Sequence, residues 1–226
     1  MSALLLSLRL AACVSAILFV IGIPLAYWLS SSHWRGKFII EAIVALPLVL
    51  PPTVLGFYVL VAMGPRGPLG KLWIALFGHG LAFTFLGLVL ASVLYSLPFA
   101  VQPLVASFDS VDRELLAVSA VLGAGRVRTF FRIILPLSVP GVMTALVLSF
   151  AHTLGEFGVV LMVGGDLAGA TRTVSIAVYD HVESLEYAEA NHLALVLLAF
   201  SFVALSIVYG LNRHFGPRIW PPWSVR

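Results

Sequence analysis

The chain has 226 residues, of which 61% are hydrophobic and only 10% are charged, and its mean hydropathy is +1.06. Because soluble domains carry about 25% charged residues, this composition excludes an ordinary soluble protein and predicts one polytopic membrane domain over residues 1–226. The formal net charge of +3 does not indicate nucleic-acid binding, since the basic residues gather beside apolar segments whose solvent is the lipid bilayer. The single cysteine, Cys13, excludes an intrachain disulfide.

Five apolar segments are long enough to cross a hydrocarbon core about 30 Å thick, so we expect an all-α membrane protein with about five transmembrane helices. The expected spans are residues 8–29, 38–63, 80–99, 139–162 and 192–211. A cleaved signal peptide is the alternative for the first span. Its apolar run is unusually long for that, and the positive residues Arg35 and Lys37 follow it rather than precede it.

The distribution of basic residues predicts that the N-terminus lies outside and the C-terminus inside. In that orientation nine basic residues lie on the cytoplasmic side, namely Arg35, Lys37, Arg113, Arg126, Arg128, Arg132, Arg213, Arg218 and Arg226. Three lie outside, namely Arg66, Lys71 and Arg172. Arg9, near the N-terminus, does not reverse the bias even if it is counted outside. No internal repeat indicates a secondary transporter built from inverted repeats.

The second span contains the stretch Leu46-Pro-Leu-Val-Leu-Pro-Pro-Thr53, so it must be kinked or broken within the membrane. Irregular backbone at this depth is tolerated where protein buries it or where it lines a water-filled cavity. Pro51, Pro52 and Thr53 are therefore candidate pathway residues, and a kink that serves only packing is the alternative. The following outer loop, residues 64–71, lacks the spacing of a phosphate-binding loop, so we expect no nucleotide site there.

A charged stretch from Asp109 to Gly141 separates the third and fourth spans. Its candidate helix N-caps are Asp109, Ser110 and Asp112. The apolar residues that recur at helical spacing in this stretch are Val111, Leu115, Val118 and Leu122. This pattern predicts an amphipathic helix with an exposed apolar stripe.

Glycines are expected to end that helix. Gly123-Ala124-Gly125 offers the left-handed cap position, and a second short basic helix from Arg126 to Leu135 should end at Pro136. The sequence thus predicts a helix–turn–helix elbow, about residues 109–136, on the cytoplasmic membrane surface. An ordinary juxtamembrane amphipathic helix is the alternative.

Glu156 is the one acidic residue deep inside an expected span, and His152 lies four residues earlier on the same helix face. A carboxylate within the membrane is costly, so both residues are pathway candidates. The alternative is a structural hydrogen bond from Glu156 to a neighbouring helix or to His152. Direct binding of an anionic substrate by Glu156 is disfavoured, because like charges repel.

An outer polar region, about residues 164–190, follows the break expected at Gly164-Gly165. Within it, residues 170–183 predict a short amphipathic helix that lies against the outer membrane face. This helix either helps to close a pathway or receives a partner, and a helix that only connects two spans is the alternative. We find no metal-ligand spacing among the histidines. Nor do we find a nucleophile–base pair, so an enzyme is not expected.

The elbow resembles the cytoplasmic loop of the integral-membrane subunits of binding-protein-dependent ABC importers, which reads E-A-A-x-x-x-G-(nine residues)-I-x-L-P. Gly123 is followed at the required spacing by Ile133 and Leu135-Pro136. The first half departs from the pattern, because Ala117 occupies the glutamate position and Glu114 lies one turn earlier. Other segments are similar to molybdate importer permeases, namely residues 46–58, 67–70, 154–158 and 171–180. Sulfate and tungstate permeases share the broad pattern.

The resemblance implies a type I ABC importer permease fold and a non-catalytic subunit that moves a tetrahedral oxyanion by alternating access. Molybdate is the expected cargo, with sulfate or tungstate as the alternative. The implied partners are a second copy of the chain, two cytoplasmic ATP-binding subunits and an extracytoplasmic oxyanion-binding protein. The implied location is a bacterial or archaeal cytoplasmic (inner) membrane, and ATP would be bound by the partner subunits, with no cofactor in this chain.

The resemblance also implies which residues transmit motion from the ATPase. These coupling candidates are Glu114, Leu115, Leu116, Ala117, Val118, Gly123, Gly125 and Pro136. Two other functions remain open at the level of sequence. One is a proton- or sodium-coupled carrier with Glu156 and His152 as the relay, which would need no ATPase. The other is a membrane-embedded enzyme, which would need a catalytic arrangement that the sequence does not show.

Overall fold

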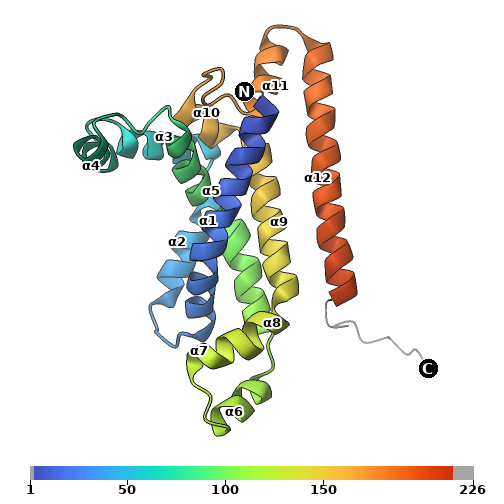
Figure 1. Cartoon of the computed structure of the whole chain (residues 1–226). Helices are drawn as coiled ribbons and strands as arrows, with labels where there is room; N and C mark the ends of the chain where they lie inside the picture. The colour runs from blue at the N-terminus through green and yellow to red at the C-terminus, as the bar shows by residue number, and fades with distance from the viewer. Residues whose placement is uncertain (1–2, 216–226) are drawn as a thin grey trace.

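A computed structural model describes residues 3–215, with side chains through residue 210, and every regular element in this part of the chain is helical. Three helices, α1 (Ala3–Ser31), α5 (Phe85–Asp109) and α9 (Val139–Gly155), pack side by side at the centre of the molecule (Figure 1). Gly22 of α1 faces α5, and a Cβ placed on it would be in ordinary van der Waals contact with Leu104 at 3.5 Å. The predicted all-α class is confirmed.

Three helices of the described chain are long and apolar enough to cross a membrane. They are α1, α5 and the Tyr187–Gly210 part of α12 (Tyr187–Phe215). Two pairs of shorter helices each pass the same test together, although each pair is strongly bent. With each bent pair taken as one span, the described residues contain up to five spans, which is the predicted number.

The first bent pair consists of α2 (Lys37–Val49) and α3 (Pro52–Met63), with an angle of 113° between them. Pro51 and Pro52 lack the N–H groups that a continuous helix would need, so the chain restarts a helix at Pro52. The predicted break is confirmed. The loop expected through Lys71 is shorter than predicted, because α4 (Pro68–Phe77) already begins at Pro68 and projects from the side of the bundle (Figure 1).

The helix α5 differs from the predicted third span at both ends. It begins at Phe85 rather than Gly80, because the Thr84 hydroxyl accepts a hydrogen bond from the Gly87 amide at 3.1 Å and caps the first turn. It then continues to Asp109 past two internal prolines. The residues 100–109, which lie beyond the predicted end of the span, are therefore part of one 25-residue helix.

The predicted fourth span, residues 139–162, is interrupted. The helix α9 ends at Gly155, and α10 (Gly158–Gly164) is a separate short helix. The interruption lies at Glu156 and Phe157, and Glu156 has extended backbone dihedrals (φ −66°, ψ 133°). We call these two residues the membrane break. The end of α10 at Gly165, with φ +61°, agrees with the prediction.

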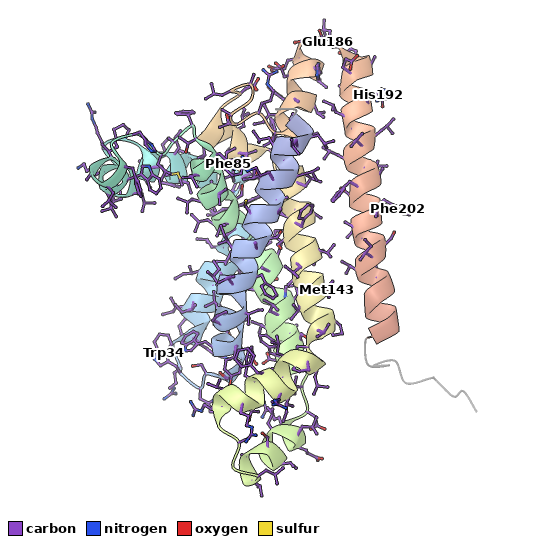
Figure 2. The ribbon with its side chains drawn as sticks, in the orientation of Figure 1. Trp34, Phe85, Met143, Glu186, His192 and Phe202 are labelled. Carbon is purple, nitrogen blue, oxygen red and sulfur yellow. The ribbon has the colours of Figure 1, made fainter. Side chains whose placement is uncertain are left out.

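The outer region contains α11 (Val174–Glu183), which begins where the Thr173 hydroxyl accepts a hydrogen bond from the Ile176 amide at 3.4 Å. The predicted amphipathic helix is thus confirmed from Val174 onward. The helix α12 contacts α9 and α11 but is mostly uncovered, since only 11% of its apolar window is buried. Figure 2 shows Phe202 on its open surface.

The predicted orientation stays a prediction, and the two ends of the bundle carry different elements. The start of α1 and the helix α11 lie at one end of the bundle, and the elbow lies at the opposite end (Figure 1). With the elbow in the cytoplasm, the N-terminal end of α1 faces outward. Three of the basic residues predicted on the cytoplasmic side, Arg213, Arg218 and Arg226, lie beyond the described side chains.

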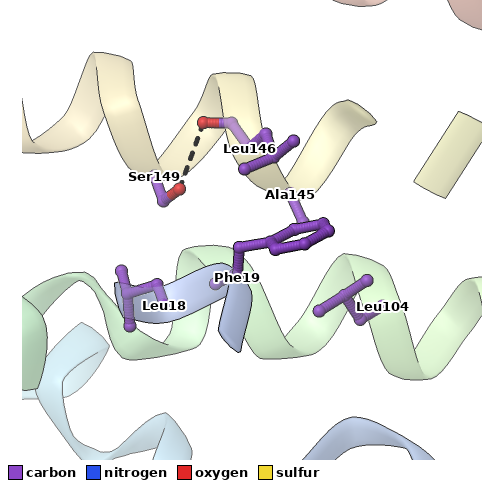
Figure 3. Close-up of a pocket in the computed structure, with 7 residues that line it drawn as sticks. Leu18, Phe19, Leu104, Ala145, Leu146 and Ser149 are labelled. Atoms are coloured by element: carbon purple, nitrogen blue, oxygen red, sulfur yellow. Dashed lines mark hydrogen bonds between the residues drawn. The ribbon is translucent and has the colours of Figure 1, made fainter. Parts of the chain in front are cut away.

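The centre of the bundle is tightly packed. A void of about 10 Å³ lies between α1, α5 and α9 and is lined mainly by apolar side chains (Figure 3). The one hydroxyl beside it, that of Ser149, donates to the Leu146 carbonyl of its own helix at 3.1 Å. A void of this size, lined in this way, is a packing defect and not a binding site.

Candidate functional site

The first helix of the elbow, α6 (Arg113–Val121), is capped by one of the three predicted residues. The Asp112 side chain accepts a hydrogen bond from the Glu114 amide at 2.8 Å. Asp109 and Ser110 are not N-caps, because α5 extends to Asp109 and Ser110 ends it. Asp109 instead accepts a hydrogen bond from the Ser30 hydroxyl at 2.5 Å, which joins the ends of α1 and α5.

Gly123 ends α6 in the predicted left-handed conformation, with φ +75°. The Ala124 amide donates to the Ser119 carbonyl and the Gly123 amide donates to the Ala120 carbonyl, both at 3.0 Å. This pair of bonds is the Schellman arrangement that satisfies the last carbonyls of a helix. The other glycine, Gly125, has φ −69° and precedes the next helix.

The second helix of the elbow runs further than predicted. It consists of α7 (Arg126–Thr129), the π-helical turn η1 (Phe130–Ile134) and α8 (Leu135–Leu137), so Pro136 does not end it. Pro136 has no N–H to donate into the helix, and its ring crowds the carbonyl four residues earlier. The backbone adapts with a wider π turn just before it, in which the Leu135 amide donates to the Phe130 carbonyl.

Three residues of the predicted apolar stripe, Leu115, Val118 and Leu122, are exposed. The fourth was predicted wrongly: Val111 is 7% exposed and belongs to the same buried cluster as Phe108, because it precedes α6. Val118 is 56% exposed and Leu122 is 80% exposed, and Leu115 lies beside them. With residues of the second elbow helix, these side chains line a hollow of about 430 Å³, whose rim carries Arg128 and Arg132. The other coupling candidates on α6 differ in burial: Glu114 and Ala117 are exposed, and Leu116 is partly buried. This surface has the chemistry of a docking site for another protein.

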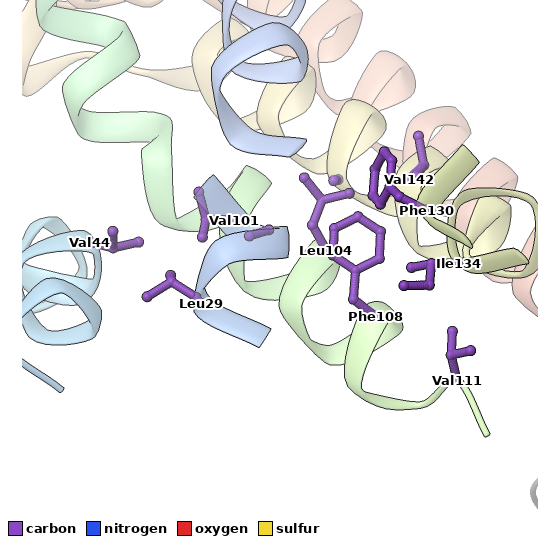
Figure 4. Close-up of a cluster of buried hydrophobic side chains, with 11 residues drawn as sticks. Leu29, Val44, Val101, Leu104, Phe108, Val111, Phe130, Ile134 and Val142 are labelled. Atoms are coloured by element: carbon purple, nitrogen blue, oxygen red, sulfur yellow. The ribbon is translucent and has the colours of Figure 1, made fainter. Parts of the chain in front are cut away.

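Aromatic packing fixes the elbow to the bundle. The rings of Tyr27, Phe108 and Phe130 come from α1, α5 and η1, with centroid separations of 4.7–6.4 Å. Ile134 and Val142 extend this cluster into α9 (Figure 4). Sequence reasoning missed the role of Tyr27, because nothing in the neighbouring residues indicates which ring it meets. A rotation of the elbow would therefore move the cytoplasmic ends of three central helices.

A polar cluster lies between α5 and α9 within the membrane. His152 Nδ1 lies 3.0 Å from the Ser96 hydroxyl, and this hydroxyl lies 3.0 Å from that of Thr153. The imidazole stacks on Phe99 with a centroid distance of 3.8 Å, and Tyr95 lies 5.0 Å away on another side. The sequence indicated His152 alone, since its partners lie more than fifty residues away along the chain.

Glu156 is 6% exposed and acts as a helix cap. Its carboxylate accepts a hydrogen bond from the Val159 amide at 2.6 Å, and the amides of Phe157 and Val160 also bond to it. These are the otherwise unpaired amides at the start of α10. Glu156 therefore bonds to the next helix of its own chain, while His152 bonds to α5.

The two interruptions of the chain lie against each other. A Cβ on Gly158 of α10 would lie 2.6 Å from Pro52 Cβ, and one on Gly56 of α3 would lie 2.8 Å from Met162 Cβ. Contacts this close require glycine. Pro51 and Thr53 remain exposed beside the break. The structure thus brings the predicted pathway residues of the second span next to the membrane break.

The outer region is held by charge pairs. Arg172 forms an ion pair with Asp166 and lies 3.4 Å from Asp180 of α11. The hydrogen bond to Asp166 raises the pKa of Arg172 above its ordinary value. Within the described residues, no group of three or more His, Cys, Asp and Glu side chains is placed to hold a metal ion.

Comparison with known proteins identifies relatives along almost the whole chain. The family model "Binding-protein-dependent transport system inner membrane component" matches residues 19–221. The molybdenum transport system permease protein ModB of Azotobacter vinelandii is 52% identical over 213 residues, which is 94% of each chain. The protein of the same name from Escherichia coli K12 is 36% identical over 212 residues, 93% of each chain.

Solved structures with low sequence identity share the fold. A chain of a bacterial ABC transporter that imports the acidic polysaccharide alginate matches with a TM-score of 0.68 and 19% identity, over 98% of this chain and 81% of that one. A chain of the MetNI methionine ABC transporter in an inward-facing conformation matches with a TM-score of 0.64 and 16% identity, over 91% and 93%. The chain therefore belongs to the family of binding-protein-dependent transport system inner membrane components, and is a multi-pass permease of an ABC importer whose ATPase is a separate subunit.

Proposed function

We propose that this chain forms the membrane pathway of a molybdate importer, as a homodimer that two cytoplasmic ATPase subunits drive and an extracytoplasmic binding protein supplies. The choice of molybdate rests on the relatives named as molybdenum permeases, which are 52% and 36% identical over more than nine tenths of the chain. Sulfate and tungstate are the alternatives, because they are tetrahedral oxyanions of the same charge.

The observation that carries the proposal is the exposed apolar stripe of the elbow. A stripe that includes Val118 and Leu122 would be costly in water and fits a groove on a partner, as amphipathic helices generally do. The coupling residues of the elbow, from Glu114 to Val118 with Gly123, Gly125 and Pro136, would transmit closure of the ATPase. The ring cluster of Tyr27, Phe108 and Phe130 would carry this movement into the central helices.

The pathway is proposed to run along the exposed side of the paired interruptions. Pro51 and Thr53 are exposed there, and α3 also presents Phe57 and Tyr58. One copy offers only an open surface at this position, so a second copy would complete a channel. Of the two pathway candidates from the predicted fourth span, His152 on α9 is partly exposed, whereas Glu156 in the membrane break would support the wall of the channel by capping α10.

The competing function is an ion-coupled carrier with Glu156 and His152 as the proton relay. The geometry disfavours it, because Glu156 bonds to backbone amides and His152 bonds to Ser96. A relay would need a direct or water-bridged path between the two groups.

The decisive experiment is transport in vesicles that contain the chain, its ATPase and its binding protein. We expect uptake of molybdate that requires ATP on the side of the vesicle membrane where the ATPase lies. Excess sulfate should inhibit this uptake only weakly. Uptake by the chain alone, driven by a proton or sodium gradient, would show that the carrier function is correct. ATP-driven uptake that prefers sulfate or tungstate would retain the importer and change its cargo.

A further inference from the structure

Two adjoining hollows lie where α1 meets the elbow. The first has a volume of about 450 Å³ and an apolar lining, with Arg126 as its only charged residue. The second has a volume of about 700 Å³ and a mixed lining, in which apolar side chains stand beside charged ones that include Arg113 and Arg126. Because Tyr27 and Arg126 line both, the two hollows form one groove with an apolar part and a basic part. We call it the α1–elbow groove.

The basic part of the groove has an excess of positive charge. His33, Lys37, Arg113 and Arg126 line it, and Asp109 is the only acidic residue that does so. Asp109 accepts a hydrogen bond from Ser30, and Lys37 lies 3.6 Å from Glu41. Within the described part of the chain, Arg113 and Arg126 form no ion pair. The groove therefore presents two unneutralised guanidinium groups.

The apolar part of the groove has the depth of one membrane leaflet. It follows α1 from Phe19 to Tyr27, a rise of about 12 Å along a helix. One half of a hydrocarbon core about 30 Å thick measures about 15 Å. Val20 and Phe131 line it and are 68% and 60% exposed, so the groove opens on the outer surface of the helix bundle.

We propose that the α1–elbow groove binds an anionic phospholipid of the inner leaflet. One acyl chain would lie along Phe19, Val20 and Ile23 of α1, and the phosphate would lie between Arg113 and Arg126. Basic pockets between membrane helices on the cytoplasmic side bind anionic head groups in this way. A free phosphate ion would leave the apolar part uncovered. An apolar segment of a second copy would leave both arginines without a negative charge.

The bound lipid would bridge α1 and the elbow, which the ring cluster of Tyr27 and Phe130 already couples in the proposed mechanism. Its acyl chain contacts α1, while Arg126 and Val127 belong to the first turn of the second elbow helix. The lipid would therefore stabilise one position of the elbow. This consequence does not depend on which oxyanion is carried.

The direct test is lipid binding to the full-length chain purified with its ATPase subunits, measured by native mass spectrometry. Phosphatidylglycerol and phosphatidylcholine serve as probes. We expect retained phosphatidylglycerol and little phosphatidylcholine. The Arg126→Gln variant should bind phosphatidylglycerol about fivefold more weakly, which is the effect of one basic residue near an anionic lipid surface. The charge-matched control is Arg35→Gln, since Arg35 is exposed on the same cytoplasmic side but does not line the groove. The affinity of this control variant for phosphatidylglycerol should be unchanged.

A second pair of variants tests the acyl chain. Val20→Trp should fill the apolar part and reduce phosphatidylglycerol binding, whereas Leu198→Trp, at an equally exposed position on α12, should not. Equal binding of both lipids, or equal losses in Arg126→Gln and Arg35→Gln, would overturn the proposal. So would displacement of the lipid by millimolar inorganic phosphate, which would indicate a site for the free anion. A disulfide between cysteines placed at Val20 in two copies of the chain would overturn it as well, because the groove would then be a contact between copies.

Discussion

The elbow and the membrane break both depend on glycine, but for different physical reasons. At the elbow, Gly123 has φ +75° and open space around it, so the backbone conformation requires glycine. At the break, Gly158 lies where a Cβ would be 2.6 Å from Pro52 Cβ, so the packing requires glycine. The first requirement is local to the chain. The second exists only after α3 and α10 have come together.

The carboxylate caps of the two regions show the same contrast. Asp112 caps α6 in an exposed position, where water competes for the same amides. Glu156 caps α10 in a buried position, where the amides are withdrawn from solvent. Because an unpaired buried amide costs more than an exposed one, the same kind of substitution should have a larger effect at the break than at the elbow. The following variants test this comparison.

The largest effect is expected for Gly158→Val. The added side chain would collide with Pro52 and separate α3 from α10. Overpacking of this kind costs about 1–3 kcal/mol in the free energy of unfolding, and the displaced break should abolish transport. The matched control is Gly155→Val, because a Cβ on Gly155 has no heavy atom within 4 Å. Thermal unfolding in detergent and uptake in vesicles measure both effects. Equal stability of the two variants would contradict the close packing of the break.

Glu156→Ala should come next. It removes the acceptor for the buried Val159 amide, which costs about 1–3 kcal/mol, and it should largely stop uptake by loosening the start of α10. Glu156→Gln keeps an oxygen that can accept this hydrogen bond, so it should retain most of the stability and most of the ATP-driven uptake. Loss of uptake in the glutamine variant, with normal stability, would instead support a role for the ionisable carboxyl group in transport.

The sequence predicts local features of the molecule better than features that depend on packing. The Asp112 cap and the left-handed Gly123 were predicted because each depends on residues within one or two helical turns. The break at Pro51 and Pro52 was predicted because proline lacks an N–H wherever it lies. Five apolar segments were enough to predict the helical class and the number of spans.

The break at Glu156 could not be predicted in the same way. The residues 139–162 are mostly apolar and long enough for one span, and the glycines on either side of Glu156 do not by themselves show whether the helix is interrupted there. What favours the interruption is the pairing of α10 with α3 through Gly56 and Gly158, together with the capping of α10 by the carboxylate. Similarly, the partners of His152 could not be inferred, because Ser96 and Phe99 approach it only when α5 packs on α9.

A smaller effect on stability is expected for Gly123→Val. A residue with a Cβ in the left-handed region costs about 1–2 kcal/mol, and the elbow can relieve this cost by changing its turn without disturbing the bundle. Membrane insertion and dimer formation should therefore be normal, while co-purification with the ATPase and ATP-driven uptake should fall sharply.

The matched control for that variant is Gly125→Val. Gly125 has φ −69° and open space for a Cβ, so valine there should leave the turn unchanged. The comparison distinguishes a conformational requirement from a general intolerance of bulk on the elbow. If Gly123→Val retains its ATPase and transports at the normal rate, the elbow is not the coupling element.

The smallest effect is expected for Asp112→Ala. Loss of an exposed helix N-cap costs about 1 kcal/mol, and only the first turn of α6 depends on this bond, because the Schellman glycine still holds its other end. Global stability and insertion should not change. Hydrogen exchange of the amides around Glu114 should become about fivefold faster, since a local opening that is easier by about 1 kcal/mol is about five times more populated. ATPase attachment should weaken by a similar factor, because a frayed α6 must order again on docking.

The matched control is Asp112→Asn, which keeps an oxygen acceptor, so the amides around Glu114 should exchange at the normal rate in this variant. Equal protection in the alanine and asparagine variants would mean that contacts with Leu116 and Ser119, and not the cap, hold α6 in place.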